Sequence, residues 1–455
     1  MDNFKDLTQG TPIKIIFLFA LPLMLGNVFQ QFYILTDTII VSQTVGVTAL
    51  AAIGCTEWLN WMGFSLVQGF AQGFSIPLAQ AFGAKDMEKC RECVFTMAIN
   101  ALLSSLFFVA ILLPSLKYIL ILLQTPQQLL DLGYSYSSII MLGLPITMFS
   151  NITSCALRAL GNSKSPFISI VIASLSNIVL DLLFVRVFNW GIQGAAIATL
   201  LAQLFCSIYN LCVLLTFKEV LPTKTYFNKT SYLHMYRLAI PTGGMNMVIA
   251  IGGMILTSVV NRYGTAFIAG FTAINKLYGI LEISAVSYGY AMVSYVGQNY
   301  GAKLYHRIYK GVKHALFLSL LSAFVIMVFL VLFGKNLINL FINTNEVEYE
   351  LIMYYSLQFL KWATIFLPIL YVLHMYRSSL QGLSDTLTPM ISGFIELFCR
   401  VGCAFLLPVF MQEKGLYFVE PAAWTGAILV LIPNYYFHER KIRKEETTKK
   451  TMSTL

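Results

Sequence analysis

Long apolar runs constrain this chain more than any other feature of its sequence. Backbone N–H and C=O groups find no water inside a bilayer, so an apolar run of about 20 residues predicts a transmembrane helix. Of the 455 residues, 57% are hydrophobic and 11% are charged, whereas soluble domains carry about 25% charged residues. We predict an all-α polytopic membrane protein with 12 transmembrane helices, at residues 13–36, 48–78, 94–116, 130–156, 165–188, 191–217, 238–262, 265–297, 312–333, 348–378, 387–410 and 420–437.

The distribution of positive charge predicts the orientation of these helices. With both termini in the cytoplasm, 22 of the 30 Lys and Arg residues lie in cytoplasmic segments and 6 lie on the other side. Positively charged loops stay in the cytoplasm, which favours this orientation in a bacterial cytoplasmic membrane. The basic tail at 438–455 is expected to lie at the lipid surface, and we expect no nucleic-acid partner.

The chain repeats itself at a spacing near 218 residues. "PLMLGN" at 22–27 matches "PTGGMN" at 241–246, and "QAFGAK" at 80–85 matches "QNYGAK" at 298–303. Each half then holds six spans in the same direction, which predicts two pseudo-symmetric six-helix bundles with a substrate path between them. We expect an N-lobe at 1–217, a cytoplasmic linker at 218–237 and a C-lobe at 238–437, ahead of the tail.

The two halves differ in their intramembrane acids. Aligned on the Gly46 and Gly264 turns, Asp37 stands opposite Ile255. Aligned on Pro166 and Pro389, Asp181 stands opposite Ala404. Asn177 and Asp181 are separated by four residues, so they share one face of their helix. At a rise of about 1.5 Å per residue, Asp37 and Asp181 both reach the outer half of the bilayer. These two carboxylates are therefore predicted to share one cavity of the N-lobe.

Polar neighbours strengthen this prediction. The first helix also carries Asn27, Gln30, Gln31 and Tyr33, and Thr199 lies on the sixth. Pro22 removes a backbone hydrogen bond from the first helix and can bend it. A carboxylate pair in a low-dielectric cavity can take up and release a proton, or hold Na⁺ with neighbouring oxygens. The alternative is that Asp37 only pairs with a neighbouring helix.

Several segments together resemble one transporter family. The segments "TDTIIVSQTVGVTALAAIG", "QAFGAKD", "LRALGNSKSP", "SNIVLDLLFV", "GIQGAAIAT" and "YRSSLQGLSDTLTPMISGFIELFCR" are similar to the multidrug and toxic compound extrusion (MATE) family. The resemblance covers nearly the whole chain. It implies a cation-driven antiporter that expels organic cations or other amphipathic compounds through a V-shaped cleft between the lobes.

The resemblance also implies roles for individual residues. The family's proton-coupling site matches Asp37, Asn177, Asp181 and Thr199, its bending proline matches Pro22, and a tyrosine of the same network matches Tyr136. The sodium-coupled NorM-like members carry acids on the seventh and tenth spans, where this chain reads "AIPTGGMNMVIAIGGMILTS" and "LPILYVLHMYRSSL". This difference favours a DinF-like member that couples to H⁺, with Na⁺ as the alternative.

Polar residues of the C-lobe have two predicted roles. Glu282 is expected to face the cleft and meet a cationic substrate, or else to pair with a group such as Lys276. Met292 and Tyr288 are candidates for an adaptable apolar lining of that cleft. Glu396 and Arg400, four residues apart, are expected to form a structural ion pair.

Other classes of function are less well supported. The sequence contains no H-E-x-x-H, G-x-S-x-G or P-loop motif, so we predict that the protein is not an enzyme and needs no cofactor or metal besides the coupling ion. We expect a monomer whose partners are small amphipathic or cationic molecules and the lipid bilayer. The alternatives are a lipid-linked precursor flippase of the same superfamily, which needs a strongly cationic cavity, and a channel or scaffold that does not transport.

Overall fold

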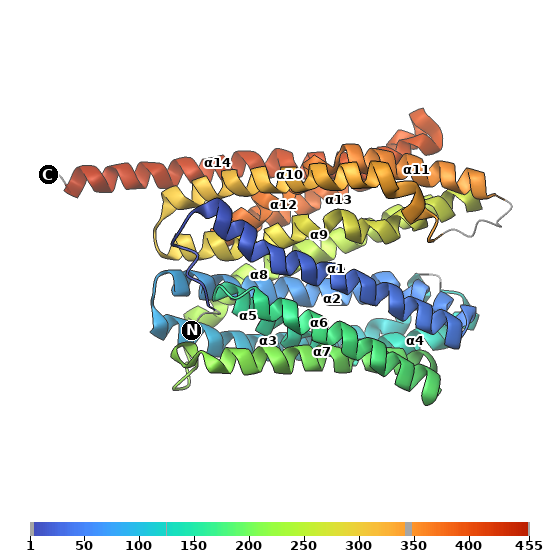
Figure 1. Cartoon of the computed structure of the whole chain (residues 1–455), viewed down its shortest axis with the longest axis horizontal. Coiled ribbons are helices and arrows are strands. Elements are labelled where there is room, and N and C mark those ends of the chain that lie inside the picture. Colours follow the sequence, from blue (N-terminus) through green and yellow to red (C-terminus); the bar gives the residue numbers. More distant parts are fainter. Residues whose placement is uncertain (1–3, 124, 342–347, 454–455) are drawn as a thin grey trace. The chain divides into compact units, whose positions relative to one another are not determined.

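The computed structural model describes residues 4–123, 125–341 and 348–453, and all regular structure in these ranges is helical (Figure 1). Within them, eight helices are long and apolar enough to cross a membrane, or ten when two bent pairs are each counted as one span. The count of ten takes α13 and α14 together as one span and leaves out α2, which is 37 residues long. Counting α2, and counting α13 and α14 separately, gives the twelve predicted segments. The structure therefore confirms the all-helical membrane fold.

The helices divide between two compact units. Unit 1 holds residues 1–7 and 21–250, and unit 2 holds residues 8–20 and 251–455. Unit 1 contains α2 (Val47–Gly83), α3 (Met87–Leu122), α4 (Gln127–Leu142), α5 (Leu144–Ala159), α6 (Lys164–Asp181), η1 (Leu182–Val187), α7 (Gly191–Thr216) and η2 (Lys218–Val220). Unit 2 contains α9 (Thr265–Gly301), α10 (Tyr305–Ile338), α11 (Tyr349–Ile365), α12 (Leu367–Gly382), α13 (Leu387–Met411), η3 (Gln412–Phe418) and α14 (Val419–Ser453).

Two long helices are shared between the units. The helix α1 (Pro12–Thr44) changes unit between Ala20 and Leu21, and α8 (Lys229–Val260) changes unit between Ala250 and Ile251. Pro22 lies inside α1 directly after this change, and its ring removes one backbone hydrogen bond there. The chain thus passes from one unit to the other within helices. In α1 this passage lies beside the missing backbone hydrogen bond at Pro22.

Two predicted spans are broken near their middles. The helices α4 and α5 meet at an angle of 45°, and α11 and α12 meet at 48°. A proline, Pro145 or Pro368, occupies the start of the second helix in each pair. Proline has no N–H to continue the helical ladder, so it fixes a bend at the same place in both halves. The spans that we predicted over 130–156 and 348–378 are therefore each built from two helices that meet at a bend.

Side-chain hydrogen bonds hold α5 against α7 in unit 1. Thr147 Oγ1 donates to Gln203 Oε1 at 2.6 Å, and Asn210 Nδ2 donates to Ser154 Oγ at 2.9 Å. Between them, Ser150 Oγ lies 3.4 Å from the Cys206 sulfur. Each pair is separated by 56 residues, so the contacts recur at every turn of the two helices. Polar contacts of this kind replace the hydrophobic driving force that helices lack in a membrane.

Small residues bring α8 close to α2 within unit 1. A Cβ atom added at Gly69 would lie 2.6 Å from the Gly243 Cα, and one added at Gly73 would lie 2.4 Å from the Ala239 Cα. The two helices therefore touch backbone to backbone, as in small-xxx-small membrane pairs. Asn246 Nδ2 reinforces the contact by donating to the carbonyl of Ser65 at 2.9 Å.

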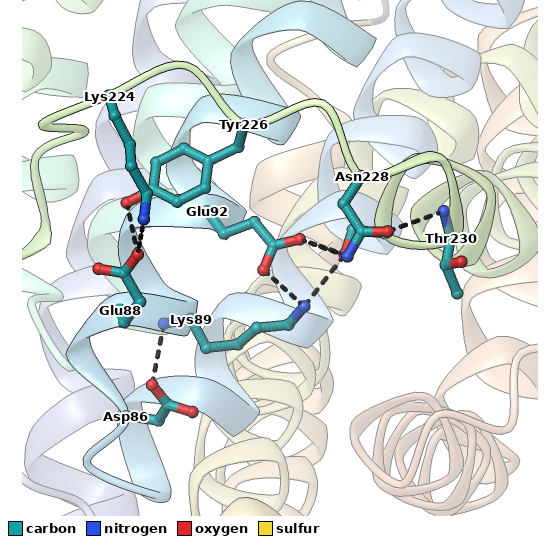
Figure 2. Close-up of polar contacts among 9 residues, drawn as sticks. Asp86, Glu88, Lys89, Glu92, Lys224, Tyr226, Asn228 and Thr230 are labelled. Carbon is teal, nitrogen blue, oxygen red and sulfur yellow. Dashed lines mark hydrogen bonds and ion pairs between the residues drawn. The ribbon is translucent and has the colours of Figure 1, made fainter.

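The segment that we predicted as a linker is attached to the start of α3. Figure 2 shows Lys224 paired with Glu88 and Asn228 bonded to Glu92, at 2.8 and 3.1 Å. Lys89, which pairs with Glu92 within α3, also donates from Nζ to Ser231 Oγ at 3.0 Å. The hydrogen bond and charge of Glu88 raise the pKa of Lys224, which stays cationic at neutral pH. The residues from 218 to 237 therefore form part of unit 1, and α8 already begins at Lys229.

The sequence repeat reappears in the turns between helices. Lys85 and Lys303 both have a φ of 58°, and each N–H donates to the carbonyl three residues earlier. In a second pair of turns, Asn162 Oδ1 accepts from the N–H of Ser165, and Asp385 Oδ1 accepts from the N–H of Thr388, each at 3.0 Å. The same local hydrogen bonds thus begin α6 and α13 in the two halves.

Aromatic and apolar side chains fill the core of unit 2. Tyr288 and Met292 lie there with exposed fractions of 1% and 0%, and the Tyr288 hydroxyl lies 3.4 Å from that of Ser322. We predicted both residues as candidates for the apolar lining of the substrate cleft, and this role stays a prediction. Both lie on the same face of α9 because they are four residues apart, and this face points inward.

Gly161 offers a direct test of the turn before α6. It has a φ of +82°, and a Cβ there would lie 1.9 Å from the carbonyl oxygen of Lys5. We expect Gly161→Ala to lower the free energy of unfolding by about 2 kcal/mol or more, because it combines left-handed backbone strain with a clash. Thermal unfolding of the purified protein measures the effect. Gly402→Ala is the matched control, since nothing lies within 4 Å of its added Cβ, and it should be neutral or stabilising.

The turn before α13 predicts a pH effect. Burial raises the pKa of Asp385, but hydrogen bonds from His438 and Thr388 outweigh it and leave that pKa below its usual value. A lowered pKa means that the ionised carboxylate stabilises the fold at neutral pH, and that this stability is lost as the pH falls through the lowered pKa. In Asp385→Asn, the melting temperature should therefore fall less steeply with decreasing pH than in the wild type, below about pH 4. An acid profile equal to that of the wild type would contradict this account.

Candidate cation-coupling site

Four helices of unit 1 bring polar side chains to one place. The helix α1 contributes Tyr33 and Asp37, which are four residues apart and share a face. The helix α6 contributes Asn177 and Asp181 at the same spacing, with exposed fractions of 1% and 0%. Thr199 of α7 faces this pair and is 9% exposed. The residues predicted to share a cavity therefore do lie together.

The two carboxyl groups form the centre of this cluster. The side chains of Asp37 and Asp181 are hydrogen-bonded to each other. Two carboxyl groups make such a bond only when one of them carries a proton, because an ionised carboxylate can only accept. In the part of the chain that the structure describes, Asp37 Oδ1 and Asp181 Oδ1 are buried and accept no hydrogen bond. The pair thus keeps two oxygens that can meet a cation or water.

Amide and hydroxyl groups fix the position of Asp181. With the amide oriented to suit its neighbours, Asn177 Nδ2 donates to Asp181 Oδ2 at 2.7 Å, and Asn177 Oδ1 accepts from the Thr199 N–H at 3.2 Å. The Tyr33 side chain is hydrogen-bonded to that of Thr199. These contacts connect α1, α6 and α7 through one network, so a change at the carboxyl pair reaches all three helices.

Tyr33 and Tyr136 flank the carboxyl pair. We placed Tyr33 only on a polar face of the first helix, although its spacing from Asp37 already indicated a shared position. Tyr136 of α4 packs against a small apolar cluster that includes Val41, and its hydroxyl is within electrostatic range of both carboxyl groups. Tyr33 is thus the site residue to which our sequence analysis gave no coupling role.

The remaining predicted residues of α1 precede Tyr33 along the helix. Gln30 is exposed, Asn27 is half-buried, and Pro22 lies eleven residues before Tyr33. Pro22 can act on the site only through the helix that it shares with Asp37.

A change of helix type follows Asp181 directly. The helix α6 ends at Asp181, and residues 182–187 form a π-helical turn. The N–H of Phe188 donates to the carbonyl of Leu183, and the Phe184 ring stacks on Trp190 at 4.8 Å. Turns of this kind are rare and occur mainly at functional sites. The corresponding part of α13 remains α-helical to Met411, so the turn distinguishes the two halves as the acids do.

Comparison with known proteins identifies the fold family. The model of the MatE family matches this chain twice, over residues 22–183 and 241–406. The chain belongs to the MatE family. Its proteins are transporters, so the protein is not an enzyme. The two matched ranges correspond to the two halves of the sequence repeat, and the resemblance that we drew from the sequence motifs is confirmed at the level of the family.

Curated relatives and a solved structure agree with this assignment. A probable multidrug resistance protein of Bacillus subtilis, YpnP, is 29% identical over 90% of this chain and 92% of its own. An FAD transporter of Shewanella oneidensis is 25% identical over 74% of this chain and 76% of its own. A crystal structure of MATE in complex with MaL6 aligns with a TM-score of 0.89 and 22% identity, covering 96% of this chain and 99% of that one.

The second half of this MatE protein carries a buried ion-pair network. Glu396 accepts from Arg377 at 2.7 Å and from Arg400 at 3.0 Å, and Arg400 also pairs with Glu420 at 2.8 Å. Glu396 and Arg400 thus lie in contact, and two further charges surround them. Glu282 of α9 is half-buried beside this network. Within the described residues, Glu282 forms no ion pair, whereas both Arg residues do.

Arg400 is the central cation of this network. Its guanidinium serves two carboxylates, and the side chain is only 6% exposed. Removal of one partner from a buried pair leaves an uncompensated charge, so Arg400→Leu should destabilise the protein by about 3–5 kcal/mol. The double variant Arg400→Leu with Glu420→Gln should recover part of this loss. Melting temperatures of the purified variants measure both effects, and an unchanged melting temperature for Arg400→Leu would contradict a structural role.

Proposed function

We propose that this chain is an antiporter that exports organic cations or other amphipathic compounds across a bacterial cytoplasmic membrane, with H⁺ as the coupling ion and Na⁺ as the alternative. Membership of the MatE family and a relative named as a multidrug resistance protein support export of small molecules. The observation that carries the coupling proposal is the hydrogen-bonded pair of Asp37 and Asp181 inside unit 1.

The chemistry of this pair suits the exchange of one positive charge. Loss of the shared proton leaves two carboxylates side by side in a medium of low dielectric constant, where like charges repel strongly. A proton, a Na⁺ ion and a cationic substrate each carry positive charge, so any of them can relieve this repulsion. Antiport follows when the site binds only one of these cations at a time and each favours a different conformation.

The network transmits the state of the pair to α1. Asp37 belongs to α1, and its partner Asp181 is held by Asn177 on α6. When the shared proton leaves, the bond between the two helices is replaced by repulsion. We propose that protonation of the pair, which restores this bond, favours a form of α1 that is bent at Pro22, where the helix lacks a backbone hydrogen bond. Glu282 of unit 2 is proposed as a contact for cationic substrates, because its carboxylate forms no ion pair within the described residues.

Transport by reconstituted protein tests this proposal. In proteoliposomes with separately imposed pH and Na⁺ gradients, efflux of an organic-cation dye should follow the pH gradient. We expect Asp37→Asn and Asp181→Asn each to reduce gradient-driven efflux at least 10-fold, because each removes the exchangeable charge. Asp131→Asn is the matched control, since Asp131 lies exposed on α4 of the same unit. This variant should transport like the wild type.

Three results would overturn the proposal. Full efflux in both carboxyl variants would show that the pair does not couple transport. Efflux that follows only the Na⁺ gradient would replace the proton by Na⁺ at this site. Dye flux that is independent of both gradients would favour a channel.

A further inference from the structure

An apolar groove runs along the outside of α5. It has a volume of about 290 Å³ and lies between α3 and α5, with Leu211 and Leu214 of α7 at its base. Six positions of α5 from Pro145 to Ala156 line it, at the spacing of one helix face, and six positions of α3 from Val94 to Ser105 line the opposite side. The groove lies wholly within unit 1 and outside the carboxyl site.

The groove begins beside the bend between α4 and α5. The helix α3 is continuous over 36 residues, whereas α4 and α5 meet at 45°. The helix α3 packs against both arms of this bent pair, and the groove lies between α3 and α5 from Pro145 onward. Leu200 presses on Gly143 at the bend, where a Cβ atom would lie 2.1 Å from its side chain. The bend, and with it the groove, is therefore fixed by close packing.

The dimensions of the groove match one leaflet of a bilayer. Eleven residue steps along α5 or α3 correspond to about 16 Å, and half of the hydrocarbon core measures about 15 Å. The lining residues Ala98 and Leu102 are exposed, Leu102 to 54%. The groove therefore opens on the outer surface of the helices, and in a membrane the medium at that surface is lipid.

The chemistry of the lining excludes water and disfavours a cationic drug. None of the lining residues, all of which the structure describes, is charged. The hydroxyls of Ser105 and Thr153 already donate to the carbonyls of Leu102 and Phe149, each at 2.9 Å. Apolar cavities of about 150 Å³ stay dry and bind hydrocarbon. An organic cation would find no carboxylate in this groove.

Cationic side chains stand beyond one end of the groove. Arg91 lies one turn before Val94 on α3, and its Nε donates to the carbonyl of Glu219 at 2.9 Å. Lys218, beside Glu219, follows the end of α7. A guanidinium and an ammonium at the level of the headgroups suit a phosphate.

We propose that this groove binds one acyl chain of a phospholipid, whose phosphate lies near Arg91 and Lys218. The lipid comes from the leaflet on the side of the α2–α3 turn, which is cytoplasmic in the predicted topology. The bound chain fills the space behind the α4–α5 bend. It lies outside the carboxyl site, and its binding does not depend on the transport activity proposed above.

Native mass spectrometry of protein purified with phosphatidylglycerol tests the proposal. The wild type should retain one phospholipid per chain under conditions that remove loosely held lipids. Ala98→Phe should fill the groove and reduce this occupancy at least fivefold. Ala110→Phe is the matched control, because Ala110 is also exposed on α3 but does not line the groove. It should retain lipid like the wild type. Equal occupancy in wild type and Ala98→Phe would overturn the proposal.

Three further measurements keep the test decisive. If Ala98→Phe does not fold, fluorescence quenching by bromine-labelled phosphatidylglycerol replaces it. The fluorescence of a tryptophan at the mouth of the groove, in Leu102→Trp, should be quenched at least twofold more than that of a tryptophan in Phe107→Trp. Phe107 is also exposed on α3. Equal quenching would contradict an acyl chain in the groove. Diacylglycerol with the same chains should bind at least fivefold more weakly, and equal binding would overturn the phosphate contact. Displacement of the phospholipid by an organic-cation dye would make the groove a substrate site and also overturn the proposal.

Discussion

The absence of water inside the bilayer is the constraint on which the rest of this structure depends. Each buried polar group has to find a partner within the protein, and most of the side chains described above do so by short, local means. Hydroxyls donate to carbonyls one turn earlier, as Thr242 does to Leu238 at 2.8 Å. Between helices, the Thr147–Gln203 and Asn210–Ser154 contacts serve the same purpose. Among the buried side-chain atoms of the described residues that lack a hydrogen bond, the carboxylate oxygens are those of Asp37 and Asp181.

The two halves of the chain show how one fold satisfies this constraint in different ways. Both begin corresponding helices with the same turns, and both break corresponding spans beside a proline. The first half places two acids together without a basic partner. The second half surrounds its acids with Arg377 and Arg400. The charges of the second half are thus balanced within a buried network, whereas the two acids of the first half are not balanced by a basic side chain in any ion pair of the described residues.

Much of this arrangement could be predicted from the sequence, because membrane length and helical spacing are local properties. Apolar runs indicated the spans, and the four-residue spacing placed Asn177 beside Asp181. Counting residues along two helices brought Asp37 to the same depth. Arg377 could not be assigned to Glu396 in this way, because their contact depends on how α12 packs on α13. The burial of Tyr288 and Met292 within unit 2 could not be predicted, because α9 is apolar around them and the sequence did not show which face is buried. The bends at Pro145 and Pro368 were hidden within apolar runs that are long enough to be single spans.

The π-helical turn after Asp181 affects how the two halves should be aligned. A π-turn accommodates one more residue than an α-turn, which rotates everything beyond it by about 100° relative to an unbroken helix. An ungapped alignment of α6 with α13, anchored at Pro166 and Pro389, is valid up to Asp181 and Ala404. Beyond that point a gap of one residue is needed to compare positions that face the same way. Single-residue insertions at this point of a related sequence therefore mark a change of helix register, and they should be kept when such sequences are compared.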